Sequence, residues 1–334
     1  MKIVEFVPPV PHPLWRLCLQ MGITDVIVKV NPSLTGLVDP WKYETLKFLV
    51  DRLAASGLRV VGLEGDPFDM APVKQFGETG GTDLEQRARA ETLAHYCDLL
   101  NSMGRLGIPL LCYNFMVGTG WARSGTRIVR GGAQATYFNR AEYERAFAES
   151  GEDGLRLNAD QIWANYECFL QAVMPAAEKA GVRMGLHPDD PCLDSLGGYA
   201  RIFGSVAAYD RAFAIWPTTA NAVTFCQANF TLMGCDLCET ARHFAKRIAF
   251  VHVRDVEGDR NDFTELFHDQ GQVDQFALMR VYRELGLDVP CRCDHVPAME
   301  GELEAIDYIP GYSTLGRLFA NGYLKALVQG TGNA

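Results

Sequence analysis

Short apolar runs rich in β-branched residues alternate with longer stretches of helical periodicity along the whole chain. This alternation is typical of parallel strands that are joined by crossover helices. The pattern predicts eight strands, the sixth with the weakest signal, at residues 2–7, 25–30, 59–63, 109–114, 182–187, 222–225, 248–253 and 289–294. Three of the predicted helices, at residues 41–56, 84–103 and 162–180, are each followed at once by a glycine, a common end of a helix.

Eight strand–helix units favour a single closed (β/α)8 barrel of the α/β class, a TIM barrel, over residues 1–334. A doubly wound open sheet is the alternative. The longest interruption, residues 115–155, follows the fourth strand and therefore belongs to the face where barrel enzymes carry their active sites. Its composition predicts a lid over an anionic substrate, with a solvated surface loop as the alternative, because it combines cations, a ring and hinge glycines: Trp121, Arg123, Arg127, Arg130, Gly131 and Gly132.

The composition is that of a globular protein with a large core, since 48% of the 334 residues are hydrophobic and 22% are charged. The net charge of -10 and the lack of long basic runs argue against a nucleic-acid partner. No apolar run reaches the roughly 18 residues of a membrane-spanning helix. The N-terminus lacks the pattern of a secretion signal, so we expect a cytoplasmic location and ten reduced cysteines. As a separate expectation, the protein forms a homo-oligomer, either a dimer or a tetramer.

Four successive strands end in side chains that can bind a metal ion. The segment Gly185-Leu186-His187-Pro188-Asp189-Asp190-Pro191 presents His187 at the mouth of the barrel, because the prolines stop the ladder of the strand. Cys226, His252 and Asp294 lie at the ends of the next three predicted strands. Neighbouring strands would bring the four together, so we expect a divalent metal site there, with a hydrogen-bonded His–Asp cluster as the alternative. Ligand softness alone suggests zinc or iron.

The motifs of the chain resemble those of the mannonate dehydratase family, which are metal-dependent sugar-acid lyases on a xylose-isomerase-like barrel. The resemblance covers roughly residues 105–328 and rests on Leu111-Cys112-Tyr113-Asn114-Phe115-Met116, Arg130-Gly131-Gly132-Ala133, His187-Pro188-Asp189-Asp190-Pro191, Thr224-Phe225-Cys226, Val251-His252-Val253-Arg254-Asp255, Phe267-His268-Asp269, Asp294-His295 and Pro310-Gly311-Tyr312. It implies that D-mannonate loses water to give 2-keto-3-deoxy-D-gluconate, with manganese or iron(II) held by His187, Cys226, His252 and Asp294.

The first hundred residues depart from the family pattern. Glu5-Phe6-Val7-Pro8-Pro9 stands where the family opens with an Arg-Trp segment. Gly120-Trp121-Ala122-Arg123-Ser124 stands where the family carries Asp-Trp-x-Arg-Thr, so an acidic group is missing. These departures concern the identity of the substrate more than the chemistry.

Elimination of water next to a carboxylate needs a base for the carbon-bound proton and an acid for the departing hydroxyl. His295 follows the expected ligand Asp294, and the resemblance places the catalytic tyrosine on Tyr312; the two are assigned jointly as acid and base. Arg254 shares a strand face with His252 and is a candidate clamp for the substrate carboxylate, with structural pairing to Asp189 or Asp255 as the alternative. Further candidate substrate contacts are Asn114, His268 and Arg123.

Two other functions remain open from the sequence. A sugar isomerase or epimerase would use the same barrel and metal, but such sites are usually rich in carboxylates and lack the thiolate that Cys226 supplies. A sugar-acid-binding protein without activity would have lost a proton-transfer group, whereas His295 and Tyr312 are both present. Dehydration of a sugar acid is therefore the main hypothesis.

Overall fold

A computed structural model describes residues 1–77, 81–150, 156–305 and 308–332. Its main element is a nine-stranded sheet in the order β1-β15-β12-β11-β8-β5-β4-β3-β2, in which all the pairings are parallel. The strands are β1 (Lys2–Ile3), β2 (Glu5–Val7), β3 (Asp25–Val28), β4 (Arg59–Glu64), β5 (Leu110–Tyr113), β8 (Arg183–Leu186), β11 (Asn221–Cys226), β12 (Ile248–Val253) and β15 (Pro290–Cys293).

The predicted first strand is split at Val4, and this split closes the barrel. Its first half, β1, pairs with β15, while its second half, β2, pairs with β3. The first and last strands of the chain are thereby joined around eight strand positions, which confirms the (β/α)8 barrel and rules out the open sheet. A buried carboxylate supports the joint, because Glu5 accepts a hydrogen bond of 2.6 Å from Asn321 and lies 3.6 Å from Arg317.

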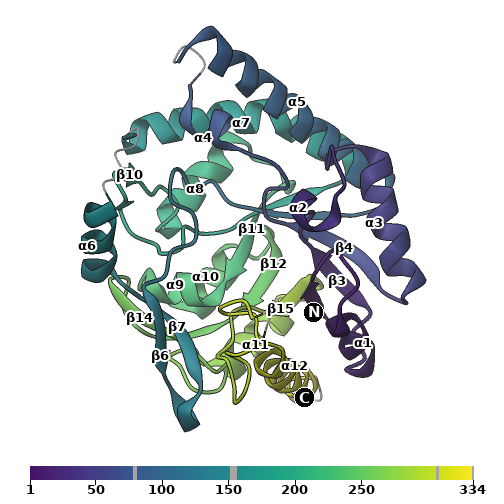
Figure 1. Cartoon of the computed structure of the whole chain (residues 1–334), viewed down its shortest axis with the longest axis vertical. Helices are drawn as coiled ribbons and strands as arrows, with labels where there is room; N and C mark the ends of the chain where they lie inside the picture. Colours follow the sequence, from purple (N-terminus) through teal and green to yellow (C-terminus); the bar gives the residue numbers. More distant parts are fainter. Residues whose placement is uncertain (78–80, 151–155, 306–307, 333–334) are drawn as a thin grey trace.

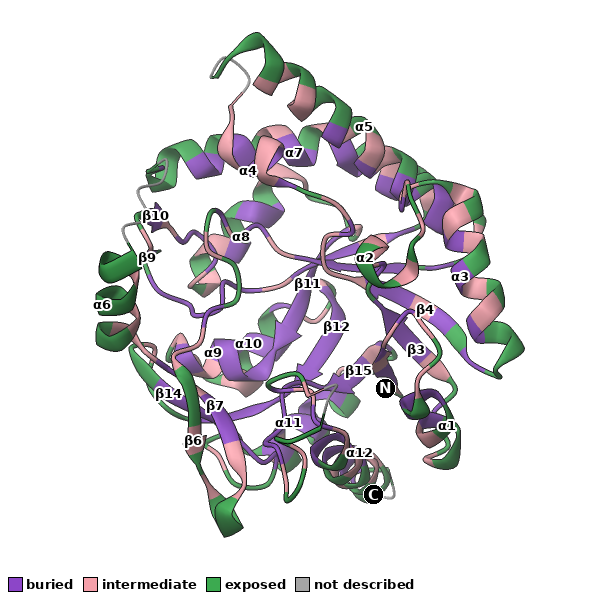
Figure 2. Ribbon diagram, viewed as in Figure 1, coloured by how far each residue is buried: buried purple, intermediate pink, exposed green. Residues whose placement is uncertain are grey.

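Helices surround the barrel, and most of them bury one face against it, whereas the short α2 has no buried residue (Figures 1 and 2). The long helices α5 and α7 lie side by side and are fixed at their starts by capping boxes, Thr82 with Glu85 and Asn158 with Gln161. The helices are α1 (Pro13–Gln20), α2 (Pro32–Thr35), α3 (Tyr43–Ala55), α4 (Ala71–Gln75), α5 (Asp83–Arg105), α7 (Ala159–Ala180), α8 (Val206–Ile215), α9 (Gln227–Leu232), α10 (Leu237–His243), α11 (Gln275–Glu284) and α12 (Thr314–Gly330).

The insertion after the fourth barrel strand is an ordered structure with strands that the sequence analysis did not anticipate. It contains β6 (Gly125–Ile128), β7 (Gln134–Asn139) and α6 (Arg140–Ser150). Strand β7 pairs with β14 (Asp262–Leu266) and β14 with β13 (Asp255–Gly258), so two hairpins form a four-stranded antiparallel sheet. We call it the accessory sheet; it lies beside the barrel (Figure 1). The lid role stays a prediction, and residues 151–155 of the insertion lie outside the described residues.

The structure also bears on the state of the cysteines and on the character of the helices. All ten cysteines are free thiols. None of the helices in the described ranges combines the length and the apolar character that a membrane crossing needs.

The close approach of α5 and α7 predicts the effect of one added methyl group. A Cβ atom at Gly104 would lie 2.6 Å from the carbonyl oxygen of Ala180, which is backbone and cannot turn away. We expect Gly104→Ala to lower the free energy of unfolding by about 1–3 kcal/mol in a urea titration. The control is Gly322→Ala in α12, where the added Cβ meets nothing within 4 Å and should stabilise by roughly 0.5–1 kcal/mol. Equal stabilisation by both changes would contradict the close packing.

Candidate metal centre and active site

A cavity of about 280 Å³ opens at the carboxyl ends of the barrel strands. The barrel strands β2, β3, β4, β5, β8, β12 and β15 each contribute at least one wall residue, from the strand itself or from the loop after it. Only β11 contributes none of the described wall residues, so the cavity lies at the centre of the barrel mouth. Its lining residues are Phe6, Lys29, Glu64, Gly65, Cys112, Tyr113, Asn114, Met116, Trp121, His187, Asp190, His252, Arg292, Asp294, His295 and Tyr312.

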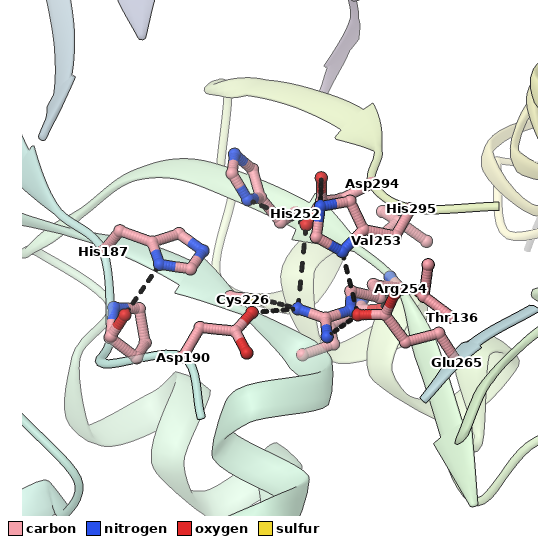
Figure 3. Close-up of polar contacts among 12 residues, drawn as sticks. Thr136, His187, Asp190, Cys226, His252, Val253, Arg254, Glu265, Asp294 and His295 are labelled. Carbon is pink, nitrogen blue, oxygen red and sulfur yellow. Dashed lines mark hydrogen bonds and ion pairs between the residues drawn. The ribbon is translucent and has the colours of Figure 1, made fainter. Parts of the chain in front are cut away.

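The four residues expected to bind a metal come together at one side of this mouth. One ligand atom each from His187, Cys226, His252 and Asp294 lies within 4.8 Å of the other three. His187 follows β8, Cys226 ends β11, His252 lies in β12, and Asp294 follows β15. These four strands are neighbours in the sheet, which is why residues far apart in sequence converge (Figure 3).

The unused hydrogen-bonding groups of the two histidines fit a bound cation. Neither buried ring nitrogen of His252 has a hydrogen-bond partner; Nδ1 lies 3.5 Å from Asp294 and Nε2 lies 3.6 Å from Glu64. A buried polar atom without a hydrogen bond is costly. The Nδ1 atom of His187 lies 2.8 Å from the carbonyl oxygen of Pro188. That oxygen can only accept, so Nδ1 carries the hydrogen and Nε2 keeps a free lone pair, the arrangement usual for a histidine that binds a metal.

The charge state of the two other donors fits the same ion. Burial alone would raise the pKa of the Cys226 thiol, but the adjacent side chains of His187 and His252 and the positive charge of Arg254 lower it to about 5. Burial likewise opposes ionisation of Asp294, yet Arg292 and the neighbouring histidines hold its pKa well below its ordinary value. A thiolate and a carboxylate are therefore ready at neutral pH, and with two imidazoles they suit a divalent transition metal.

The carboxylates around His252 favour the cationic form of its ring, with a proton on both nitrogens, when no ion is bound. Burial and Arg292 disfavour its cationic form, but the carboxylates of Glu64 and Asp294 outweigh them and raise its pKa well above its ordinary value. A metal ion can bind only the neutral ring, so binding here displaces a proton and strengthens as the pH rises.

His295 and Tyr312 lie beside the same carboxylate. The Nε2 atom of His295 is 3.6 Å from Asp294, and the hydroxyl of Tyr312 is 3.5 Å from it. His295 has a left-handed backbone, with φ of 30°, which turns its ring so that Nδ1 lies 2.9 Å from Glu265. The edge of Trp121, from the insertion, meets the same ring at a centroid distance of 5.2 Å. Burial and Asp294 raise the pKa of Tyr312 above its ordinary value.

Arg254 and Arg123 lie behind the cavity wall, where both bind Asp190 and Glu265 (Figure 3 shows Arg254). Burial opposes ionisation of the two carboxylates, but the two guanidinium groups hold their pKa values well below the ordinary range. We call these four residues the buried charge cluster. Arg254 thus has a structural ion pair, with Asp190 in place of the expected Asp189 or Asp255, and the substrate contacts expected of both arginines stay predictions.

The remaining candidates divide between the cavity and the core. Asn114 lines the cavity, and its side-chain oxygen accepts hydrogen bonds from Lys74 at 3.2 Å and from the Met116 amide at 3.1 Å. His268 does not line it. Its Nε2 atom lies 2.6 Å from the carbonyl oxygen of Val253, and burial lowers its pKa to about 4, so the neutral ring belongs to the protein interior.

Sequence reasoning missed several polar residues of the site. Glu64 ends β4 and binds Arg292 through two hydrogen bonds of 2.6 and 3.0 Å, while Arg292 also lies 2.9 Å from Asp294. The strand-end argument would have found Glu64 if the third strand had been extended by one residue. Arg292 had a signal too, since the alternation Cys291-Arg292-Cys293 places it on the face opposite to the cysteines. Glu265 had none, because it lies on the unexpected accessory sheet.

A match to a protein-family model shows the family of the chain. The model of the D-mannonate dehydratase family matches residues 20–151 and 152–334. The chain belongs to the D-mannonate dehydratase family. It is therefore an enzyme of the lyase class, as predicted, and the match extends into the N-terminal third, which the sequence analysis had judged divergent.

Similar proteins cover nearly the whole chain. Mannonate dehydratase of Streptococcus agalactiae is 24% identical over 340 residues, covering 90% of this chain and 93% of its own. Mannonate dehydratase 2 of Halalkalibacterium halodurans is 26% identical over 337 residues, with the same coverage. The crystal structure of mannonate dehydratase from Streptococcus suis has a TM-score of 0.85 at 24% identity, covering 99% of this chain and 95% of its own. An L-ribulose 3-epimerase has a TM-score of 0.60 at 13% identity, covering 99% and 96%.

The Glu64–Arg292 pair predicts a pH dependence of stability. Burial would raise the pKa of Glu64, but Arg292 and His252 lower it from 4.5 to about 2. A carboxylate with a depressed pKa stabilises the fold above its unfolded pKa and loses this effect as the pH falls through the folded value. In urea titrations with chelator present, wild type should exceed Glu64→Gln by roughly 2–3 kcal/mol above pH 4.5, and the difference should shrink toward pH 2. The exposed Glu149→Gln is the control, and a difference that does not change with pH would contradict the ion pair.

Proposed function

We propose that the protein removes water from D-mannonate to give 2-keto-3-deoxy-D-gluconate. The proton leaves C2, next to the carboxylate, the hydroxyl leaves C3 as water, and the resulting enol becomes the 2-keto acid. The observation that carries this proposal is a group of four candidate metal ligands, three of which line one cavity together with His295 and Tyr312, in a chain of this family. The proposal keeps the expected cytoplasmic location and homo-oligomeric state.

His187, Cys226, His252 and Asp294 would hold the divalent ion, which we propose to be Mn²⁺ or Fe²⁺. When bound, such an ion supplies positive charge for the enediolate that develops as the C2 proton is removed. The ring nitrogens of His252, which make no hydrogen bond, and the lowered pKa of Cys226 support this assignment.

His295 and Tyr312 are proposed to move the two protons. The Nδ1 hydrogen of His295 is donated to Glu265, so Nε2 faces Asp294 and the cavity with a free lone pair and can accept the C2 proton. The raised pKa of Tyr312 keeps its hydroxyl protonated at neutral pH, so this group can protonate the departing hydroxyl. The two assignments together complete the base and the acid of the elimination.

The other candidate residues take different roles in this proposal. Asn114 lines the cavity and contacts a hydroxyl of the sugar acid. Arg123 and Arg254 hold Glu265, which in turn holds His295, so they act on substrate through the position of that ring. His268 supports the protein interior behind the cavity.

The test of function is a panel of sugar acids. Protein loaded with Mn²⁺ should convert D-mannonate to a 2-keto-3-deoxy acid, and chelator should abolish the reaction. Interconversion of aldoses, ketoses or their epimers without any keto-deoxy product would instead favour the isomerase or epimerase. Tight binding of the acid without turnover would favour the sugar-acid-binding protein.

We expect His187→Ala to weaken Mn²⁺ binding by about 100-fold or more, because the ion loses one of its two imidazole ligands. Elemental analysis and the rise in melting temperature on adding Mn²⁺ measure this without an activity assay. His243→Ala is the matched control, since His243 is exposed on α10 and pairs with Asp210 at 2.7 Å. Unchanged metal content in the His187 variant would remove this residue from the site.

We expect His295→Asn and Tyr312→Phe each to lower kcat by roughly 10²–10⁴ while Mn²⁺ still binds, because each change removes a proton-transfer group and none of the proposed ligands. Steady-state kinetics and metal analysis of the same preparations measure the two properties. The controls are His243→Asn and Tyr323→Phe, at a surface histidine and at a tyrosine of α12 remote from the cavity. Near-normal turnover in either active-site variant would contradict its assignment.

A further inference from the structure

Lys29 lies at the mouth of the cavity in a position that neither the metal site nor the proton-transfer groups use. It follows β3 directly, lines the cavity and is exposed. Its stem lies across Gly65, where an added Cβ would be 3.4 Å from both Cδ and Cε and 3.6 Å from Nζ of the lysine. The lysine stem thus lies at van der Waals distance from this position at the end of β4, where the φ of +82° favours glycine.

The other positive charges near the cavity are already matched by carboxylates. Arg292 binds Glu64 and Asp294, and the two arginines of the buried charge cluster bind Asp190 and Glu265. Lys74, behind Asn114, binds Asp66 at 2.7 Å. Among the described residues, Lys29 is the cation of the cavity wall that has no carboxylate within 4 Å, so it is available to an anionic ligand.

The order of the strands places this charge across the mouth from the metal-binding side chains. The four proposed ligands belong to β8, β11, β12 and β15, which are consecutive in the sheet. Lys29 follows β3, and β3 lies opposite β11, the strand of Cys226, in the barrel. Three strand positions separate them in either direction: β4, β5 and β8 on one side, and the β1/β2 strand, β15 and β12 on the other. In a barrel of this kind the substrate binds at the face formed by the carboxyl ends of the strands. A sugar acid with C1 at the metal ligands would therefore extend its other end toward Lys29.

We propose that Lys29 binds a carboxylate at the end of the substrate remote from the metal ligands, so that the enzyme prefers six-carbon sugar diacids over sugar monoacids. This inference rests on the proposed dehydration and adds a selective contact at C6. A diacid of the same configuration as mannonate would lose water between C2 and C3 in the same manner, while its second carboxylate would meet the ammonium group. A monoacid has a hydroxymethyl group there and gains no such ion pair.

The experiment compares D-mannonate with D-mannarate, which has the same configuration and a carboxylate at C6, on Mn²⁺-loaded wild type and Lys29→Met. We expect wild type to show a kcat/KM for the diacid about fivefold or more above that for the monoacid, as one partly exposed ion pair allows. Lys29→Met should remove this preference, and raised salt should reduce it in wild type. Lys29→Arg keeps the charge and should retain most of it. Lys179→Met, at an exposed lysine near the end of α7, is the matched control.

Each other outcome overturns a defined part of the proposal. Equal losses for both acids in Lys29→Met would mean that the lysine binds the carboxylate next to the reacting carbon, and the diacid preference would be wrong. The absence of any preference in wild type would have the same consequence. If neither acid is dehydrated, the proposed function fails, and calorimetric titration of the Mn²⁺-loaded protein with the two acids then decides the inference alone. Wild type and Lys29→Met should still differ in their ratio of dissociation constants.

Discussion

The site depends on the buried charge cluster formed by Arg123, Arg254, Asp190 and Glu265. These residues come from the insertion, from the loop after β8, from the residue after β12 and from the accessory sheet, so the cluster joins four separate segments. Removing one partner of a buried ion pair leaves an uncompensated charge, which costs about 3–5 kcal/mol. The segments are therefore held together as a unit, and its members Glu265 and Arg254 contact the side chains of His295 and Cys226.

The cluster also links the insertion to the chemistry of the mouth. Arg123 anchors the segment that brings Trp121 against His295, and Glu265 binds both Arg123 and the Nδ1 atom of the same ring. Arg254 lies 3.8 Å from the sulfur of Cys226 and favours its thiolate. One set of charges thus orients the proposed proton-transfer group His295 and favours the thiolate of the proposed metal ligand Cys226. This explains why Arg254, predicted as a substrate clamp, is fully buried.

The fold and the grouping of the proposed metal ligands were within reach of the sequence because both follow from local patterns. Alternating strand and helix periodicity predicts the barrel, and a side chain at a strand end is positioned by the order of strands alone, which is how His187 and Asp294 were found together. The sequence did not predict the roles of Glu265 and Lys29 or the pairing of β7 with β14. These features depend on contacts between distant segments that no periodicity encodes. Lys29 was read as part of the second strand, which in fact ends at Val28. The split of the first strand at Val4 is likewise a property of its two neighbours.

That split strand has a consequence for how the molecule is made. One segment near the N-terminus pairs with the second strand on one side and with the last strand on the other, and Glu5 meets Asn321, which is 316 positions away. Contacts of such large sequence separation form slowly, because the loop entropy must be lost before the contact forms. During synthesis the segment of β1 leaves the ribosome long before β15, so its edge stays open in the nascent chain until β15 has been made. The barrel therefore closes only after β15 has been synthesised, and until then the edge of β1 has no strand partner and is open to pairing with other chains.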